Sequence, residues 1–262
     1  LTLTVQTRYN NNFKIISQRV YESIICSNAR FNYEEIDEFF EEKKEFEAEI
    51  AEALKIMRKL SANLTQNRVK CGYLRLNIPE TIFIFDDEGH VVDLDRSKET
   101  ASHKIIENFM LVANEFIAKE LSDGKTIYRI HEKPDEKRLL NLKEEISSYN
   151  IKMEMNKNLN TVLQDLLDKL PDENYHRVFD RKVLRSMKKA KYTVENLGHF
   201  GLAMRNYTHF TSPIRRVADC VCHYLLKYIF RNKLYQTESL IPFNDTELEN
   251  LSLKCLETTK ND

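Results

Sequence analysis

The chain has 262 residues, of which 42% are hydrophobic, so it can bury a sizeable core in one large domain or in two intertwined lobes. Its 40 lysines and arginines are balanced by 41 aspartates and glutamates. This balance excludes a uniformly basic nucleic-acid-binding surface, and any basic site must be local. The five cysteines have neither a metal-binding spacing nor an even count, which is typical of intracellular thiols.

Neither a membrane span nor a secretory signal is recognisable. No apolar run approaches the roughly 20 residues that cross a bilayer, and the first residues lack the pattern of a leader peptide. We therefore expect an intracellular protein, cytoplasmic or nuclear, with no membrane partner.

The first residues predict a strand hairpin. Apolar and polar residues alternate in LTLTVQTRYNNNFKIIS, and the run Asn10–Asn12 supplies the turn. The alternation is already under way at Leu1, and the chain stops within a helical pattern at ELENLSLKCLETTKND. We therefore expect a fragment that is truncated at both ends.

A long helix is expected next. Asn32 and Glu35 have the spacing of a capping box, and the helix should continue to about Leu64 with the charges of EEKKEFEAEIAEALKIMRKL on its solvated face. The following segment, CGYLRLNIPETIFIFDDEGHVVDLD, is typical of strands. Its turn residues Asp87–Gly89 predict a second hairpin.

Another strong helix is predicted within ETASHKIIENFMLVANEFIAKELSDGK. Glu107 and Asn114 depart from its apolar stripe, and Gly124 lies just beyond its end. The stripe follows the 3.6-residue period and comprises Ile105, Ile106, Phe109, Met110, Ala113, Phe116 and Ile117.

The second half of the chain predicts a short strand, a loop at Pro134 and a helix within TIYRIHEKPDEKRLLNLKEEISSYN. Two more helices are expected over about 158–170 and 175–191, followed by an extended YTVENLGHFGLAM. These elements define a mixed α+β fold, rich in helices, in which helices pack on small antiparallel sheets.

Residues 206–230, NYTHFTSPIRRVADCVCHYLLKYIF, predict a helix over 212–231 whose start is unusual. Ser212 suits the N-cap, and Pro213 suits the first helical position. The expected buried stripe comprises Ile214, Val217, Ala218, Val221, Leu225 and Tyr228.

Two arginines fall in the first turn of this helix. Arg215 and Arg216 would lie beside free backbone N–H groups, where a cation is repelled by the helix dipole by a few tenths to about 1 kcal/mol. The placement is favourable if a phosphate binds there. Asp219 is expected to brace the Arg215 guanidinium. The alternative is a surface Arg–Asp pair on an ordinary helix.

Residues 207–223, with YTHFTSPIRR followed by VAD and a histidine, resemble the signature of the RNB domain. This is the catalytic domain of the ribonuclease II and ribonuclease R family, which includes the exosome-associated exoribonuclease. The resemblance covers almost the whole chain, as a partial RNB domain over residues 1–262. The other matching blocks, in order, are ICSNARFNYEEI, GYLRLNIPETIFIFDDEGHVVDL, IIENFMLVANEFIAKEL, YRIHEKPDEKRL and HFGLAMRNYTHFTSPIRR.

The resemblance implies 3′-to-5′ hydrolysis of single-stranded RNA to nucleoside 5′-monophosphates by a two-metal displacement with Mg²⁺. The family arginine at the scissile phosphate maps onto Arg215, and Arg216 extends the basic surface. Tyr33 matches a tyrosine near the RNA path, and Glu107 matches an acidic position near the end of the RNA channel. The implied partners are single-stranded RNA and the exosome or another RNA-decay complex.

Tyr207 and Phe210 are further candidates for RNA binding, as residues that line the RNA path. Packing in the core is an equally weighted alternative for both. For His131, His199 and His209 we expect hydrogen-bonded structural roles, since no acid or cysteine lies at metal-binding spacing from them.

The family's aspartate cluster has no counterpart here, so the Mg²⁺ ligands are expected outside this chain. Asp86 and Asp87 are better explained as turn residues, whereas Asp93 and Asp95, on one face of a strand, are weak metal candidates.

Three further positions depart from the family pattern. Val217 replaces the usual tyrosine, Cys26 replaces an arginine of many bacterial members, and Leu76 lies near the position of a stacking phenylalanine. Two functions therefore remain: an exoribonuclease, or a catalytically silent RNB-type RNA-binding regulator. An aspartate cluster upstream of Leu1 would distinguish the first from the second.

Overall fold

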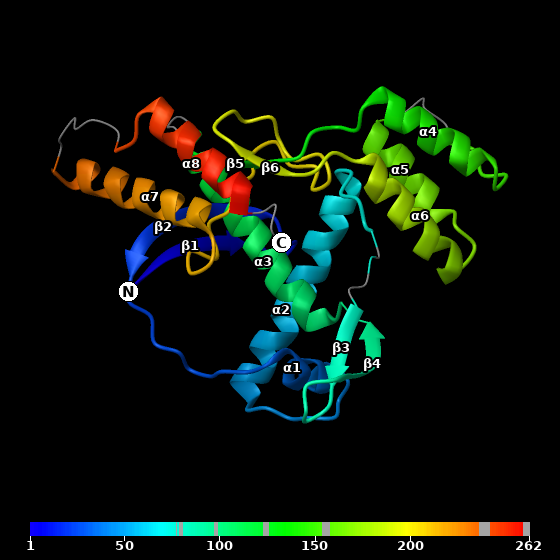
Figure 1. The fold of residues 1–262 in the computed structure, drawn as a ribbon. Coiled ribbons are helices and arrows are strands. Elements are labelled where there is room, and N and C mark those ends of the chain that lie inside the picture. The colour runs from blue at the N-terminus through cyan, green and yellow to red at the C-terminus, as the bar shows by residue number, and fades with distance from the viewer. Residues whose placement is uncertain are drawn as a thin grey trace.

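The computed structural model describes residues 1–76, 78, 81–96, 99–122, 126–153, 158–235 and 242–258. Within these residues, helices pack on three two-stranded antiparallel sheets (Figure 1). This arrangement confirms the predicted helix-rich α+β class. No helix in the described part of the chain is long and apolar enough to cross a membrane.

The N-terminal hairpin is confirmed. Strand β1 (Thr2–Tyr9) pairs antiparallel with β2 (Ile15–Ser23). The Asn10 side-chain oxygen accepts hydrogen bonds from the backbone N–H groups of Asn12 at 3.0 Å and Lys14 at 2.9 Å. The local asparagine chemistry thus fixes the turn that the sequence predicts.

The capping box is also confirmed. Helix α1 (Tyr33–Phe40) begins after Asn32, whose side chain accepts from the Glu35 N–H at 2.8 Å, while the Glu35 carboxylate accepts from the Asn32 N–H at 2.9 Å. Both contacts satisfy N–H groups that the helix itself leaves unpaired.

The single helix predicted through Leu64 is wrong. Helix α1 ends at Phe40, and α2 (Ala48–Lys70) starts after a break in which Glu42 has a φ of 62°. The Phe46 ring lies 4.6 Å from the ring of Phe31 and 5.4 Å from that of Phe39. The aromatic cluster stabilises a chain reversal that helical periodicity does not reveal.

Helix α3 (Ala101–Glu120) runs through the centre of the molecule and packs on α2 (Figure 1). Buried Asn108 donates to the hydroxyls of Ser61 at 2.7 Å and Thr65 at 2.9 Å across this interface. The predicted apolar stripe is wrong at Ile106, which is exposed. The polar Asn114, which is not part of that stripe, is buried. Gly124 lies outside the described residues.

The second hairpin is confirmed and joins β3 (Thr81–Phe85) to β4 (Val91–Arg96). In its turn the Asp86 carboxylate accepts from the N–H groups of Glu88 at 3.0 Å and His90 at 2.8 Å. Gly89 has a φ of 83°, a conformation that glycine adopts without strain.

The region 126–205 contains a short sheet and three helices. Strand β5 (Tyr128–Ile130) pairs with β6 (Lys191–Thr193), as predicted for the first strand. Helices α4 (Glu136–Ser147), α5 (Leu159–Asp168) and α6 (Glu173–Ser186) form a separate helical lobe (Figure 1). Helix α6 ends before the expected residue 191, because residues 191–193 pair with β5. The expected extended segment becomes a loop after Thr193.

The last two helices are α7 (Val217–Tyr235) and α8 (Asp245–Thr258), which share a core with the end of α3 and the first hairpin. The predicted start of α7 at Ser212 is wrong, since residues 213–215 form a turn. Ile214 is 96% exposed and Val217 is 50% exposed, so these two residues leave the predicted stripe. Its remaining buried members are Ala218, Val221 and Leu225.

Candidate nucleic-acid interface

Residues 206–216, here called the motif loop, are fixed to α3 by one buried side chain. The Asn114 amide donates to the Tyr207 hydroxyl at 3.2 Å and accepts from the Phe210 N–H at 3.0 Å. A polar residue therefore stands at position 114 of this helix because its side chain holds the motif loop.

Helix α7 holds the same loop from the other side. His223 donates from Nε2 to the Phe210 carbonyl at 2.9 Å, and its ring stacks on the Phe210 ring at 4.5 Å. Tyr207 and Phe210 are both buried. Their rings pack in the core, which is the alternative weighed above, so a direct contact of either ring with RNA stays a prediction.

Asp219 is fully buried and organises the end of the motif loop. Its carboxylate accepts from Arg216 Nε at 2.8 Å, from Arg216 Nη2 at 2.9 Å and from the Ser212 N–H at 2.7 Å. The expected brace of Arg215 by Asp219 is wrong, and the partner is Arg216. Because the helix begins at Val217, the preceding turn directs Arg216 rather than Arg215 toward this carboxylate.

Arg215 is exposed at the end of the turn. Its backbone N–H donates to the Ser212 carbonyl at 3.3 Å. In the part of the chain that the structure describes, no residue forms a hydrogen bond or ion pair with its guanidinium. The site therefore combines one arginine held by a buried carboxylate with one whose planar donor group is free to bind an anion.

A third arginine lies near this pair. The Arg129 guanidinium lies 4.7 Å from the Tyr192 ring centre, and its buried Nη1 has no hydrogen-bond partner among the described residues. The Tyr192 hydroxyl is hydrogen-bonded to His209 Nδ1 at 2.6 Å. Burial, together with the charges of Arg216 and Arg129, lowers the pKa of His209 to about 3. The histidine is therefore neutral, and the arginines set the charge here.

His199 behaves like His209, because burial and the neighbouring His131 lower its pKa to about 3. An unfolded histidine titrates near pH 6.5. Below that pH the unfolded chain binds protons that the folded chain does not, so the free energy of unfolding should fall as the pH drops from 6.5 toward 3. We expect a loss of about 1.4 kcal/mol per pH unit for each histidine.

Urea unfolding at pH 7, 6 and 5 measures this dependence. His209→Gln should remove about half of the slope between pH 6 and 5 that His199 and His209 jointly cause. An unchanged slope in the His209→Gln variant would contradict the neutral state assigned to this histidine.

Glu107 lies on α3 in a network of polar side chains. Lys104 Nζ contacts Glu107 Oε2 at 2.7 Å and Glu99 Oε1 at 2.8 Å, and the Tyr73 hydroxyl donates to Glu107 Oε1 at 3.3 Å. Glu107 lies seven positions before Asn114, which corresponds to about 10 Å along the helix axis. Helix α3 thus carries both the acidic candidate and the anchor of the motif loop.

Tyr33 opens α1, next to the start of α3. Its ring stacks on the His103 ring at a centroid distance of 3.9 Å, and the residue remains 41% exposed. His103 is held in turn by a 2.7 Å hydrogen bond between its Nδ1 and the Thr100 hydroxyl. One face of a fixed aromatic pair is therefore accessible to a planar ligand.

The aspartates considered as metal ligands do not form a cluster. Asp93 and Asp95 each accept a hydrogen bond from the N–H of the next residue, at 2.8 and 2.7 Å, and Asp86 holds its own turn. Within the described ranges no three histidine, cysteine or acidic side chains are placed to hold a metal ion. These residues do not fit a two-metal centre.

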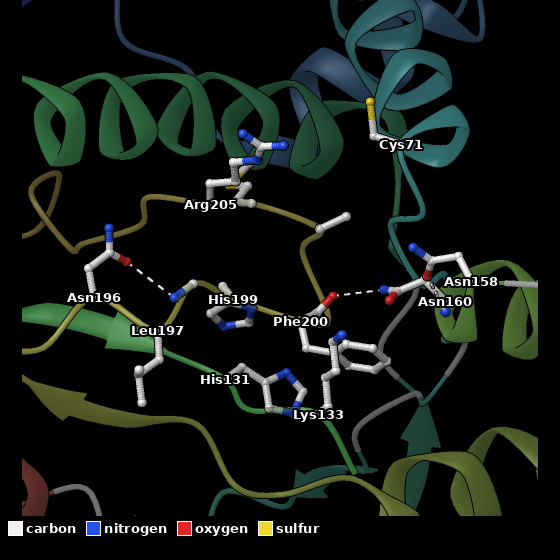
Figure 2. A pocket seen from close by; sticks show the side chains of 13 residues that line it. Cys71, His131, Lys133, Asn158, Asn160, Asn196, Leu197, His199, Phe200 and Arg205 are labelled. Carbon is white, nitrogen blue, oxygen red and sulfur yellow. Dashed lines mark hydrogen bonds between the residues drawn. The ribbon is translucent and has the colours of Figure 1, made fainter.

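A polar cavity of about 640 Å³ lies beside the loop 196–205, at the ends of β5 and α2 and the start of α5 (Figure 2). Sequence reasoning missed this cavity. A signal for the tight loop was present in GHFGLAM: Gly198 has a φ of 73°, and a Cβ on Gly201 would lie 3.0 Å from His131 Nδ1. Gly198 adopts a conformation that favours glycine, and a Cβ at Gly201 would require the His131 ring to shift.

Comparison with known proteins confirms the resemblance inferred from the motifs. The family model described as the RNB domain matches residues 1–232. The chain therefore belongs to the RNB domain family.

Ribonucleases R are among its relatives. The chain is 35% identical over 261 residues to ribonuclease R of Thermotoga maritima. The aligned region covers 93% of the chain and 35% of that protein. It is 32% identical over 265 residues to ribonuclease R of Aquifex aeolicus. This alignment covers 96% of the chain and 37% of that protein. The chain thus spans about a third of the length of these curated relatives.

Solved structures agree with this assignment. RNase R of Mycoplasma genitalium in complex with ribose-methylated single-stranded RNA superposes with a TM-score of 0.91 at 27% identity, over 98% of this chain and 41% of that one. The structure of its complex with double-stranded RNA superposes with a TM-score of 0.90 at 28% identity, over 98% of this chain and 47% of that one. Yeast Ssd1, described as a pseudonuclease, superposes with a TM-score of 0.72 at 18% identity, over 97% of this chain and 31% of that one. This similarity concerns the fold alone.

Proposed function

We propose that this chain is part of a 3′-to-5′ exoribonuclease that hydrolyses single-stranded RNA to nucleoside 5′-monophosphates. The observation that carries the proposal is the free guanidinium of Arg215, on a loop fixed by buried Asp219 and Asn114. Membership of the RNB family supports the same reaction.

In this proposal Arg215 binds the scissile phosphate. Its fork of N–H donors matches two phosphate oxygens, and the interaction strengthens as negative charge grows in the transition state. Arg216 has a different role, because its guanidinium is already engaged by Asp219. It adds positive potential and keeps the motif loop in position.

The RNA path would run from Arg215 along α3 toward Tyr33. The free face of the Tyr33–His103 pair suits stacking by a base, a contact worth about 1–3 kcal/mol and tolerant of sequence. The Glu107 carboxylate is an acceptor for a ribose 2′-hydroxyl, which DNA lacks. Together these contacts account for preference for RNA over DNA without preference for a base.

Mg²⁺ would be the cofactor of the complete enzyme, where it would supply Lewis-acid activation of water and phosphate. Its ligands must come from outside the described residues, which do not provide a carboxylate cluster. Association with the exosome or another decay complex stays a prediction.

The test compares binding and degradation by the purified chain. We expect salt-dependent binding of a 5′-labelled single-stranded RNA, with a slope of about −0.7 per phosphate contacted, and weaker binding of the same sequence as DNA. With Mg²⁺ or Mn²⁺ we expect no shortening by this chain alone, because the metal ligands are absent from its described part.

Degradation is then measured after this chain replaces the corresponding third of Thermotoga maritima ribonuclease R. Ladder-wise shortening from the 3′ end by that chimera supports the exoribonuclease. Tight RNA binding without shortening by a folded chimera would instead indicate the silent RNA-binding regulator. Affinity that is equal for DNA and insensitive to salt would contradict both functions.

A further inference from the structure

We propose that the polar cavity binds the phosphate of a nucleotide, as a site distinct from the Arg215 turn. The inference rests on the proposed function, because an RNA strand and its mononucleotide product are the ligands that the exoribonuclease would present.

Among the residues that the structure describes, the wall contains two cations and no carboxylate. Lys133 and Arg205 line the cavity, and neither forms an ion pair within the described part of the chain. The nearest acid in sequence, Glu132, is already paired with Lys191 at 2.9 Å and with Lys188 at 3.6 Å. Within the described ranges the charge of the cavity is therefore not compensated by an acid, which favours an anionic ligand.

The two histidines of the wall add no charge. His131 Nδ1 accepts from the Gly201 N–H at 3.1 Å, and His199 Nδ1 accepts from the Leu202 N–H at 3.2 Å. Burial lowers the pKa of both rings. Their task is to hold the loop that forms the cavity, so Lys133 and Arg205 remain as the phosphate-binding groups.

The size and the remaining surface of the cavity favour a nucleotide over a free phosphate ion. A volume of 640 Å³ lies within the range of about 300–1,000 Å³ that is typical of small-molecule sites. Leu197 is 49% exposed and offers an apolar surface against which a base or ribose can pack. Figure 2 shows Leu197, Lys133 and Phe200 around the cavity.

The part of the cavity wall at the start of α5 is polar. Asn160 is buried and donates to the carbonyls of Gly72 and Phe200, each at 2.8 Å. The Asn158 side-chain oxygen accepts from the Asn160 N–H at 3.0 Å, and no described residue accepts from the Asn158 NH₂ group at the cavity. The start of α5 thus contributes a polar group that suits a base edge or a phosphate oxygen.

Cysteine chemistry provides a direct reporter. Cys71 lines the cavity and is exposed, so a bound ligand should shield its thiol from alkylation. Cys26 is exposed but does not line the cavity, and it serves as an internal control. Cys220, also exposed, contacts the Pro213 carbonyl at 3.0 Å and therefore reports on the motif loop.

The experiment measures iodoacetamide labelling of the 262-residue chain by peptide mass spectrometry, with AMP as the probe. At about ten times its dissociation constant, AMP should slow Cys71 labelling about tenfold and leave Cys26 unchanged. Lys133→Ala should weaken this protection by AMP about tenfold. Lys189→Ala removes an exposed lysine outside the cavity and should have no effect.

Two ligand controls identify the recognised group. Inorganic phosphate should compete with AMP at Cys71, whereas adenosine should not protect this thiol. Protection by adenosine equal to that by AMP, or no protection by AMP at millimolar concentration, would overturn the inference. Protection that persists in a Lys133→Ala, Arg205→Ala double variant would do the same, because the ligand would then bind elsewhere.

Different results would refute the nucleotide-binding cavity and the exoribonuclease function. If RNA shields Cys220 and the chimera degrades RNA while AMP leaves Cys71 reactive, the cavity assignment is wrong and the exoribonuclease stands. If AMP protects Cys71 in the expected manner while RNA is neither bound nor degraded, the exoribonuclease is wrong and the cavity remains a nucleotide site.

Discussion

Replacing Asp219 with alanine is expected to lower the free energy of unfolding by about 3–5 kcal/mol, because the change leaves a partly buried cation without its partner. The substitution also leaves the Ser212 N–H without an acceptor. For a chain of this size the midpoint of thermal unfolding should fall by about 10 °C. Thermal and urea unfolding of the purified variant measure the effect.

A surface ion pair provides the matched control. Lys43 and Glu41 are 2.6 Å apart but both are exposed, so Glu41→Ala should lower the free energy of unfolding far less than Asp219→Ala. A double variant, Asp219→Asn with Arg216→Gln, should recover part of the loss, since neither side chain is then charged. A loss in Asp219→Ala no larger than in Glu41→Ala would refute the anchoring role of Asp219.

In the chimera with Thermotoga maritima ribonuclease R, Arg215→Ala should lower the rate of the cleavage step by about 100- to 1,000-fold, because charge stabilisation is lost in the transition state. The affinity for RNA should fall by less than about tenfold, since one phosphate contact among several is removed. Single-turnover cleavage and equilibrium binding separate the two effects. Arg215→Lys should restore only part of the rate, because a point charge replaces the planar fork.

Lys227 supplies the charge-matched control for this experiment, as an exposed lysine on α7. Lys227→Ala should leave the cleavage rate unchanged. Equal losses of affinity and rate in Arg215→Ala would make Arg215 a plain binding residue. A rate unaffected by Arg215→Ala would remove this residue from the site.

Local sequence determined several elements of this protein by itself. The Asn10–Asn12 turn, the Asn32 capping box and the Asp86–Gly89 turn each depend on contacts within a few residues, so their chemistry is legible in the chain. The motif at 207–223 identified the family for the same reason, since its residues are contiguous.

Only the tertiary structure decided which arginine is held and which is free. The choice depends on where α7 begins, and that start is fixed by the Ser212–Asp219 contact and by the anchoring of the motif loop on Asn114. Periodicity placed Ile214 and Val217 in the core, yet both are exposed, because residues 213–215 form a turn instead of a helix.

The break between α1 and α2 and the polar cavity have the same origin. Phe46 contacts Phe31 across a chain reversal, and the cavity joins the end of α2, β5, the start of α5 and the loop 196–205. Such contacts join residues far apart in the chain, and their free energy depends on which surfaces meet after folding. Propensity and spacing depend on neighbours within a few residues, so they specify helices, strands and turns. The packing of distant segments decides which residue pairs with each charged side chain and where a cavity remains.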